Sequence, residues 1–295
     1  MPTVREEMRQ ALSRAPAVLG ASRDHVVAYL RSQANPDGGF CGRTPASDLY
    51  YTVFALQALL ALGAEVPRNA IERYLASFGR GEELDFVHLA CLARCWADLG
   101  GQSPAPGFRD AVLRRIETFR TPDGGYNPVP AAESGTVYGC FLALGARQDL
   151  QAEIPDPGGV LRCLGALRVP EGGYANDHLL ASGTTPATAA AATLVRHLGQ
   201  PVEPELSAWL LARVDRRGGF LATPNAPLPD LLSTAVALHA LAGLGASLDP
   251  LREPCLDFVD TLWSTHGAFY GTWLDETADC EYTYYGLLAL GHLST

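Results

Sequence analysis

The feature that most constrains this sequence is a short turn motif that recurs along almost the whole chain. Its clearest copy is Pro36-Asp37-Gly38-Gly39-Phe40. Three further copies and one degraded copy are Gly124-Gly125-Tyr126, Gly172-Gly173-Tyr174, Gly218-Gly219-Phe220 and His266-Gly267-Ala268-Phe269. An apolar run that closes on Leu-Gly follows each copy, at Gly63, Gly145, Gly199, Gly245 and Gly291. One more such run, residues 85–100, has no turn before it, so we count six units of roughly 40 to 50 residues, a period typical of repeat proteins.

Each unit predicts two helices with different surfaces. The first helices carry Arg and Glu and are expected at residues 24–32, 69–78, 108–119, 160–167, 205–214 and 254–263. The second helices are apolar nearly all round and are expected at residues 48–62, 85–99, 135–144, 186–198, 230–244 and 279–290. A helix without a polar face must be buried on every side, whereas an amphipathic helix tolerates solvent. The pattern therefore predicts an all-α protein, a single (α/α)6 toroid with six inner and six outer helices. An open superhelix is the alternative, but it would leave half of each inner helix in water.

Domain organisation follows from where the repeat begins. We expect residues 1–21 to form an N-terminal helix extension, with the helix at residues 4–13, and residues 22–295 to form the toroid. Gly63 is expected to supply the left-handed residue that ends the first of the inner helices. In the degraded turn, His266 is expected to replace the first glycine.

Composition restricts the partners and the chemistry. A net charge of −10 argues against nucleic acid or an anionic membrane surface as the main partner. The chain contains no lysine, which excludes a Schiff-base lysine and a phosphate-loop lysine. No apolar stretch reaches the roughly 18 residues that a membrane span requires. Seven cysteines without a paired spacing, a charged start and no secretory apolar segment predict a cytoplasmic protein.

The repeat resembles a known superfamily. A Gly-Gly-aromatic turn, a short loop, the pattern Asp-x-x-Tyr-Thr and an apolar helix that ends in Leu-Gly are similar to the protein prenyltransferase β subunits and the squalene–hopene type of terpenoid cyclase, the prenyltransferase and squalene oxidase repeat proteins. The resemblance covers about nine-tenths of the chain. It implies an α/α toroid whose central cavity binds a hydrophobic, isoprenoid substrate.

Prenyltransferase β subunits work with a helical partner subunit and hold a catalytic zinc through an Asp, a Cys two residues later and a His from the next unit. The matching Asp here is Asp230, where Leu232 stands at the cysteine position and Tyr282 at the histidine position. In the other register Asp279 is kept, Glu281 stands at the cysteine position and Cys280 is one residue out, which turns a ligand by about 100° on a helix. No metal ligand set is therefore predicted, and no cofactor, although zinc is kept as an alternative.

The squalene–hopene type of cyclase carries Asp-x-Asp-Asp-Thr at the start of an inner helix, and its middle Asp protonates the polyene. Asp279-Cys280-Glu281-Tyr282-Thr283 resembles this motif, with Glu281 in the middle place. We expect Glu281 to be the catalytic acid and Asp279 its partner, because two carboxylates two residues apart can share a proton and raise the pKa of one of them. The alternative is a solvated acidic first turn that complements the helix dipole.

Aromatic residues gather at the starts of the inner helices, where ring faces can stabilise a carbocation in a dry pocket. The expected substrate contacts are Tyr50, Tyr51, Tyr138, Asp230, Tyr282 and Tyr285. Core packing is the alternative for the rings, and helix capping is the alternative for Asp230. His88, Cys91 and Cys95 share one inner helix, but buried cysteines are common and a structural role is expected for them.

Three functions remain open from the sequence. The first is an isoprenoid- or polyene-handling enzyme, similar to terpenoid cyclases, that uses acid catalysis from the Asp279 and Glu281 pair. The second is a prenyltransferase β-like subunit that works with a partner and zinc. The third is a non-catalytic toroid that binds a hydrophobic ligand.

Overall fold

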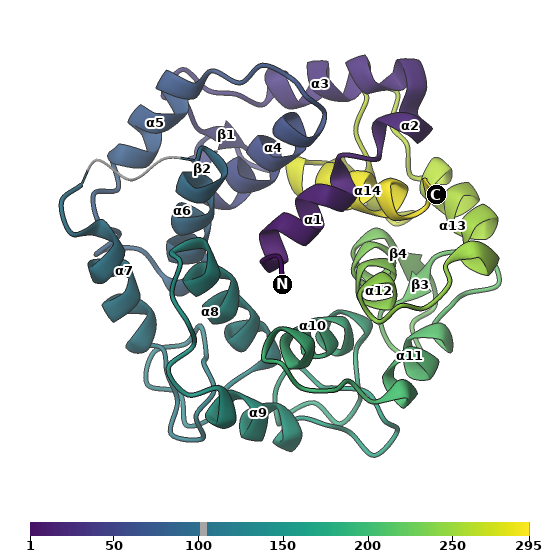
Figure 1. Cartoon of the computed structure of the whole chain (residues 1–295). Coiled ribbons are helices and arrows are strands. Elements are labelled where there is room, and N and C mark those ends of the chain that lie inside the picture. Colours follow the sequence, from purple (N-terminus) through teal and green to yellow (C-terminus); the bar gives the residue numbers. More distant parts are fainter. Residues whose placement is uncertain (101–104, 295) are drawn as a thin grey trace.

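Two concentric rings of helices make up the molecule (Figure 1). The computed structural model describes residues 1–100 and 105–294. The inner ring consists of α4 (Leu49–Ala61), α6 (Phe86–Asp98), α8 (Val137–Asp149), α10 (Thr185–His197), α12 (Leu231–Gly243) and α14 (Cys280–His292). The outer ring consists of α3 (Arg23–Ser32), α5 (Arg68–Ala76), α7 (Phe108–Glu117), α9 (Pro157–Ala166), α11 (Pro204–Leu211) and α13 (Asp249–Thr261). Because α14 packs against both α12 and α4, the ring is closed. The prediction of an (α/α)6 toroid is confirmed, and the open superhelix is wrong.

All six inner helices are 13 residues long and begin in the same way. A polar residue before each helix accepts a hydrogen bond from a backbone N–H of the first turn: Asp48, Asp85, Thr136, Thr184, Asp230 and Asp279. These side chains satisfy donors that a helix leaves without a partner at its start. The equal lengths and equal starts place corresponding residues of the six helices at the same height in the ring.

The ends of the inner helices follow the prediction in part. Gly63 has positive φ after α4, as expected, and Gly199 and Gly245 have positive φ after α10 and α12 as well. Gly145 and Gly291 instead lie inside α8 and α14, so the predicted ends there are wrong. A Cβ at Gly291 would lie 2.0 Å from the carbonyl oxygen of Ala11, and a Cβ at Gly145 would lie 2.7 Å from Nη2 of Arg94. These two glycines make room for other groups rather than ending a helix.

The repeated turn ties each outer helix to the inner helix that follows it. Its first glycine has positive φ in every copy, at Gly38, Gly124, Gly172, Gly218 and Gly267. The aromatic residue is buried, and in four copies its backbone N–H donates to the threonine at the fourth position of the inner helix: Phe40 to Thr52, Tyr174 to Thr188, Phe220 to Thr234 and Phe269 to Thr283. Because Gly267 holds the first glycine position, the expectation that His266 replaces it is wrong; Ala268 replaces the second glycine.

Three of the loops after these turns form short antiparallel hairpins that the sequence pattern did not predict. They pair β1 (Phe40–Cys41) with β2 (Ser47–Asp48), β3 (Phe220–Leu221) with β4 (Pro229–Asp230), and β5 (Tyr270–Thr272) with β6 (Asp275–Ala278). With only two to four residues per strand, they are too short to show a period-2 pattern.

The N-terminal segment does not lie outside the ring. Helix α1 (Val4–Leu12) runs through the middle of it, close to α14, as Figure 1 shows, and α2 (Pro16–Leu19) and the 3-10 turn η1 (Gly20–Ser22) lead from it to α3. Thr3 and Glu6 form a capping box at its start. Its side chains reach the C-terminal residues of α6, α8 and α10, so α1 covers the end of the ring at which the inner helices finish.

Some helix starts differ from the predicted ones. Helix α9 begins at Pro157 rather than at residue 160, and α10 begins at Thr185 rather than at residue 186, because Thr184 caps it. Helix α13 begins at Asp249 with Pro250 in its first turn, so Pro254, the predicted start, lies inside the helix. Among the described residues, no helix combines the length and the apolar character that crossing a bilayer demands.

Candidate active site

The middle of the ring encloses a cavity of about 270 Å³. Most of its lining comes from residues at the second, fifth, sixth and ninth positions of the inner helices, the spacing that places side chains on one face of a helix. Helix α1 contributes Met8, whose sulfur accepts a hydrogen bond from the Tyr284 hydroxyl at 3.4 Å. The cavity is therefore closed by α1 at one end and lies open toward the starts of the inner helices, where Tyr138 is 40% exposed.

The second positions form a tier at the mouth of the cavity. All six line it: Tyr50, Val87, Tyr138, Pro186, Leu232 and Glu281. Glu281 is the one acidic residue of this tier and of the cavity lining as a whole, within the part of the chain that the structure describes.

A tyrosine holds the carboxyl group of Glu281. The hydroxyl of Tyr50 donates to Oε1 of Glu281 at 2.6 Å. Burial raises the pKa of the Glu281 carboxyl, and the charge of Asp279 raises it further, whereas the Tyr50 hydrogen bond and Arg43 lower it. Burial also raises the pKa of Tyr50, which keeps this phenol protonated as a donor. The net result is a carboxyl group that holds its proton to higher pH than an exposed glutamate.

Asp279 lies at the same helix start but has different contacts. It is 1% exposed, caps α14 by accepting from the backbone N–H of Tyr282 at 2.8 Å, and accepts from Nε of Arg43 at 3.1 Å. Burial raises its pKa. Asp279 is not part of the cavity lining, so it acts on Glu281 through its charge rather than by touching what the cavity holds.

Aromatic rings cover the wall between α14 and α4. The ring of Phe54 meets the edge of Tyr50 at 5.0 Å, Tyr284 at 5.1 Å and Tyr285 at 5.8 Å between centroids. All four residues line the cavity. They surround the Glu281 side of the cavity with π-electron density and keep water away from it.

The predicted substrate contacts divide into two groups. Tyr50, Tyr138 and Tyr285 line the cavity. Tyr51, Asp230 and Tyr282 lie outside its lining, each for a visible reason. A Cβ at Gly42 would lie 2.2 Å from the Tyr51 ring, and one at Gly271 would lie 2.3 Å from the Tyr282 ring, so both rings pack on loop glycines. Asp230 accepts from the N–H and the hydroxyl of Ser233 at 2.7 Å each, as a helix cap.

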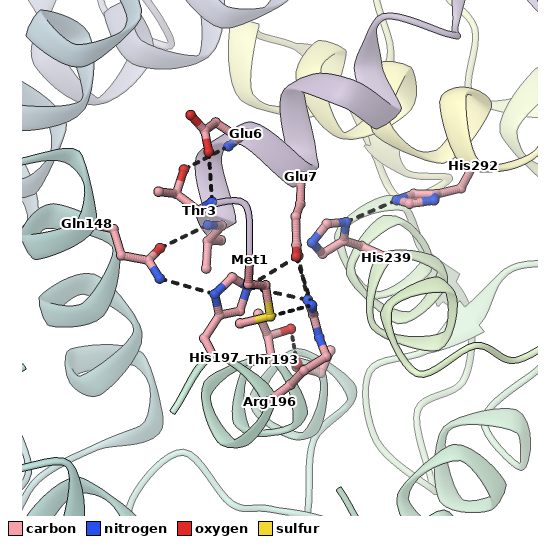
Figure 2. A network of polar contacts seen from close by, with 12 residues as sticks. Met1, Thr3, Glu6, Glu7, Gln148, Thr193, Arg196, His197, His239 and His292 are labelled. Atoms are coloured by element: carbon pink, nitrogen blue, oxygen red, sulfur yellow. Dashed lines mark hydrogen bonds and ion pairs between the residues drawn. The ribbon is translucent and has the colours of Figure 1, made fainter. Parts of the chain in front are cut away.

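The deep end of the cavity holds polar residues that the sequence interpretation did not single out. They stand at the ninth positions of four inner helices: Gln57, Arg94, Thr193 and His239. The sequence does contain an indication of these polar residues, because Arg94 interrupts the apolar sequence of α6 and His239 interrupts that of α12. Figure 2 shows this end of the ring, where Glu7 of α1 forms an ion pair with Arg196 and Gln148 accepts from the backbone N–H of Val4 at 2.9 Å.

The donor set does not fit a catalytic zinc. The cysteine and histidine positions of the zinc pattern are held by Leu232 and Tyr282, neither of which supplies a zinc ligand of the required kind. His88 is bound by Asp85 at 2.9 Å and Asp48 at 3.2 Å instead of approaching Cys91 and Cys95. No cluster of three or more His, Cys, Asp and Glu side chains suited to a metal occurs among residues 1–100 and 105–294.

Comparison with known proteins identifies the family. The sequence matches the prenyltransferase alpha-alpha toroid domain over residues 10–174 and 162–294. The chain therefore belongs to this family of α/α toroids. No curated protein matches it by sequence.

Solved structures show the same fold at low sequence identity. The type II terpene cyclase MstE from Scytonema, as a variant in complex with geranylgeranyl dihydroxybenzoate, is 13% identical with a TM-score of 0.63 over 99% of this chain and 98% of that one. The protein geranylgeranyltransferase-I of Candida albicans, complexed with GGPP, is 14% identical with a TM-score of 0.69 over 92% and 90% of the two chains. A glycosidase variant is 10% identical with a TM-score of 0.58 over 99% and 98%. Because this fold is shared by proteins with different activities, the function has to be argued from the cavity.

Proposed function

We propose that this protein is an isoprenoid- or polyene-handling enzyme of the terpenoid cyclase kind, with Glu281 as its catalytic acid. The observation that carries the proposal is the position of Glu281, a single carboxyl group with a raised pKa in an otherwise apolar, aromatic cavity mouth. A carboxylic acid that holds its proton to higher pH than an exposed glutamate is the group that such a reaction needs. The fold likeness to type II terpene cyclase MstE, which is described with a geranylgeranyl substrate, agrees with it.

The proposed step uses residues of this chain alone. The protonated oxygen of Glu281 gives its proton to one carbon of a carbon–carbon double bond, and the other carbon becomes a carbocation. The carboxylate left behind keeps the hydrogen bond from Tyr50, which stabilises its negative charge. The rings of Phe54 and Tyr285 stabilise the cation while a second double bond attacks it and closes a ring. Loss of a proton from the cyclised cation restores a neutral alkene, and Glu281 is reprotonated for the next turnover.

The test is turnover by a variant that cannot give a proton. Wild-type protein is incubated with farnesol, farnesoic acid and squalene in heavy water, and mass spectrometry detects a cyclised product that carries one new deuterium. We expect Glu281→Gln to lower the rate by about 100-fold or more, because general acid catalysis contributes about 10² to 10⁴. Glu276→Gln, an exposed acid on β6, is the control and should keep the wild-type rate. Unchanged turnover in Glu281→Gln would refute the proposal.

A prenyltransferase β-like subunit is the second candidate, supported by the fold likeness to geranylgeranyltransferase-I. It predicts stoichiometric zinc by elemental analysis and a helical partner that copurifies. The third candidate is a toroid that only binds a hydrophobic ligand. It predicts that an isoprenoid extracted from the purified protein and identified by mass spectrometry is returned unchanged after incubation.

A further inference from the structure

The deep end of the cavity carries a cationic group in an apolar surrounding. Arg94 lines the cavity from α6, below the aromatic tier and next to α1. Its Nε donates to Oδ2 of Asp149 at 3.1 Å. Within the described chain, the two Nη groups of Arg94 make no hydrogen bond, and 19% of its side chain is accessible. Since Arg94 lies within the ring, this accessible surface faces the cavity.

The neighbouring helix makes space for this group. Arg94 and Gly145 both stand at the ninth position of their helices, α6 and α8. A Cβ at position 145 would lie 2.7 Å from Nη2 of Arg94, so a side chain there would displace the end of the guanidinium. Glycine at this position therefore lets the guanidinium extend along α8 at the deep end of the cavity.

His239, a second polar residue at the same level, also has a nitrogen without a hydrogen-bond partner. His239 lines the cavity, is 5% exposed, and pairs through Nδ1 with Nε2 of His292 at 3.0 Å. Figure 2 shows this pair beside the end of α1. The Nε2 atom of His239 is buried and has no hydrogen-bond partner within the described residues. Burial lowers the pKa of His239 to about 4, so the ring is neutral and this nitrogen is free to bond a ligand.

The charges around Arg94 determine what kind of ligand fits. Arg5 bonds both Asp98 at 3.1 Å and Asp149 at 2.7 Å, so two guanidinium groups and two carboxyl groups form one cluster. Burial raises the pKa of Asp98 to about 6, so the cluster is neutral while Asp98 is ionised and gains one positive charge when Asp98 binds a proton. A ligand with one negative charge is balanced by that single proton, whereas a diphosphate with several charges is not.

We propose that the deep end of the cavity is a carboxylate-binding site, in which the Nη groups of Arg94 bind the acid end of a hydrophobic substrate. A planar guanidinium matches the two oxygens of a carboxylate. Seven residues separate the second and ninth positions, which is about 10 Å along a helix, so an apolar tail bound by its acid end passes the aromatic tier and reaches Glu281. The isoprenoid nature of the tail rests on the proposed function; the carboxylate end does not.

The experiment measures binding without turnover. Farnesoic acid, farnesol and farnesyl monophosphate share one tail, and isothermal titration calorimetry compares them on the full-length protein. We expect wild type to bind the acid about tenfold or more tighter than the alcohol, the effect of one charge-assisted hydrogen-bonded pair. Arg94→Met should abolish this difference, and Arg94→Lys should restore part of it. Arg147→Met is the matched control, because Arg147 is buried in α8 and pairs with Glu117 away from the cavity.

Each outcome decides for or against the site. Equal affinity of wild type for acid and alcohol, a preserved preference in Arg94→Met, or tighter binding of the monophosphate than of the acid would overturn the assignment. Thermal unfolding confirms that Arg94→Met is folded; Asp149 keeps its bond to Arg5 in this variant. If that variant does not fold, Arg94→Gln replaces it, and a preference undiminished there would also overturn the site. Measuring both binding and turnover in Glu281→Gln tests the two proposals separately. Loss of turnover supports the catalytic role of Glu281, and an intact acid preference in the same variant supports the carboxylate site.

Discussion

At the scale of single residues, two neighbouring acids of one helix start have different surroundings. Asp279 is the extended cap residue before α14, whereas Glu281 is the second residue of the helix. The side chain of Asp279 therefore bonds the backbone of the first turn and Arg43, and that of Glu281 faces the cavity. A pair that looks equivalent in the sequence therefore consists of one structural cap and one candidate acid.

The Tyr50 hydroxyl is expected to adjust the strength of this acid. In Tyr50→Phe, the hydrogen bond that lowers the pKa of Glu281 is lost, so the pKa rises further. Turnover requires the protonated acid and should fall as pH increases through this pKa. We expect the fall to move to higher pH in Tyr50→Phe and the maximal rate to drop by about 10- to 100-fold, since the product carboxylate loses its donor.

The measurement is a pH–rate profile of the cyclisation assay for wild type and variant. The pKa of Glu281 responds to the charges of Asp279 and Arg43 and to the Tyr50 hydrogen bond. Tyr270→Phe, on β5, serves as the control. A profile that is unmoved in Tyr50→Phe would contradict this role.

At the scale of elements, α1 is the part whose position depends most on a single glycine. Gly291 lies inside α14 against Ala11, and any side chain there would collide with the backbone of α1. The contact brings α1 close enough to bond Asp98, Asp149 and Arg196, and to close the cavity with Met8.

We expect Gly291→Val to displace α1 and to lower the free energy of unfolding by about 1 to 3 kcal/mol, as overpacking does. Urea unfolding followed by circular dichroism measures the loss, and binding of a hydrophobic dye should increase because the deep end of the cavity opens. Gly165→Ala is the control: it lies in α9 with no atom within 4 Å of the added Cβ, and should be neutral or slightly stabilising. Equal stability of the two variants would mean that α1 is not held by this contact.

At the scale of the whole molecule, closure of the ring joins the first repeat to the last. Helix α14 packs on α4, and the Tyr29 hydroxyl of α3 donates to the carbonyl of Ala278 at 3.0 Å. Every repeat therefore has two neighbours, and α1 bonds α6, α8, α10 and α14. An open repeat array, in contrast, can unfold from its ends.

We expect the toroid to unfold in one transition. Urea titrations followed by far-UV circular dichroism and by tryptophan fluorescence should coincide. Gly38→Ala in the first repeat and Gly218→Ala in the fifth should both shift this one transition to lower urea, because each added Cβ would lie 2.1 Å or less from a carbonyl oxygen of the next outer helix. Separate transitions by circular dichroism and by tryptophan fluorescence would show that the ring does not act as one unit.

The sequence alone determined the architecture and singled out the candidate acid. The repeated turns, the apolar second helices and their polar caps depend on local rules: positive φ at glycine, capping at helix starts and burial of apolar faces. The repeat also indicated the height of Glu281 in the ring, because residues at corresponding positions of helices of equal length lie at the same height.

The tertiary structure decided what a local pattern does not contain. Whether Tyr51, Tyr282 and Asp230 face the cavity depends on the rotation of each helix against its neighbours, and whether Gly145 and Gly291 end a helix depends on Arg94 and Ala11 from distant parts of the chain. The path of α1 through the ring is likewise set by partners about 90 to 190 residues away, such as Asp98 and Arg196. These contacts, which close the cavity and give it a charged deep end, exist only once the ring has formed.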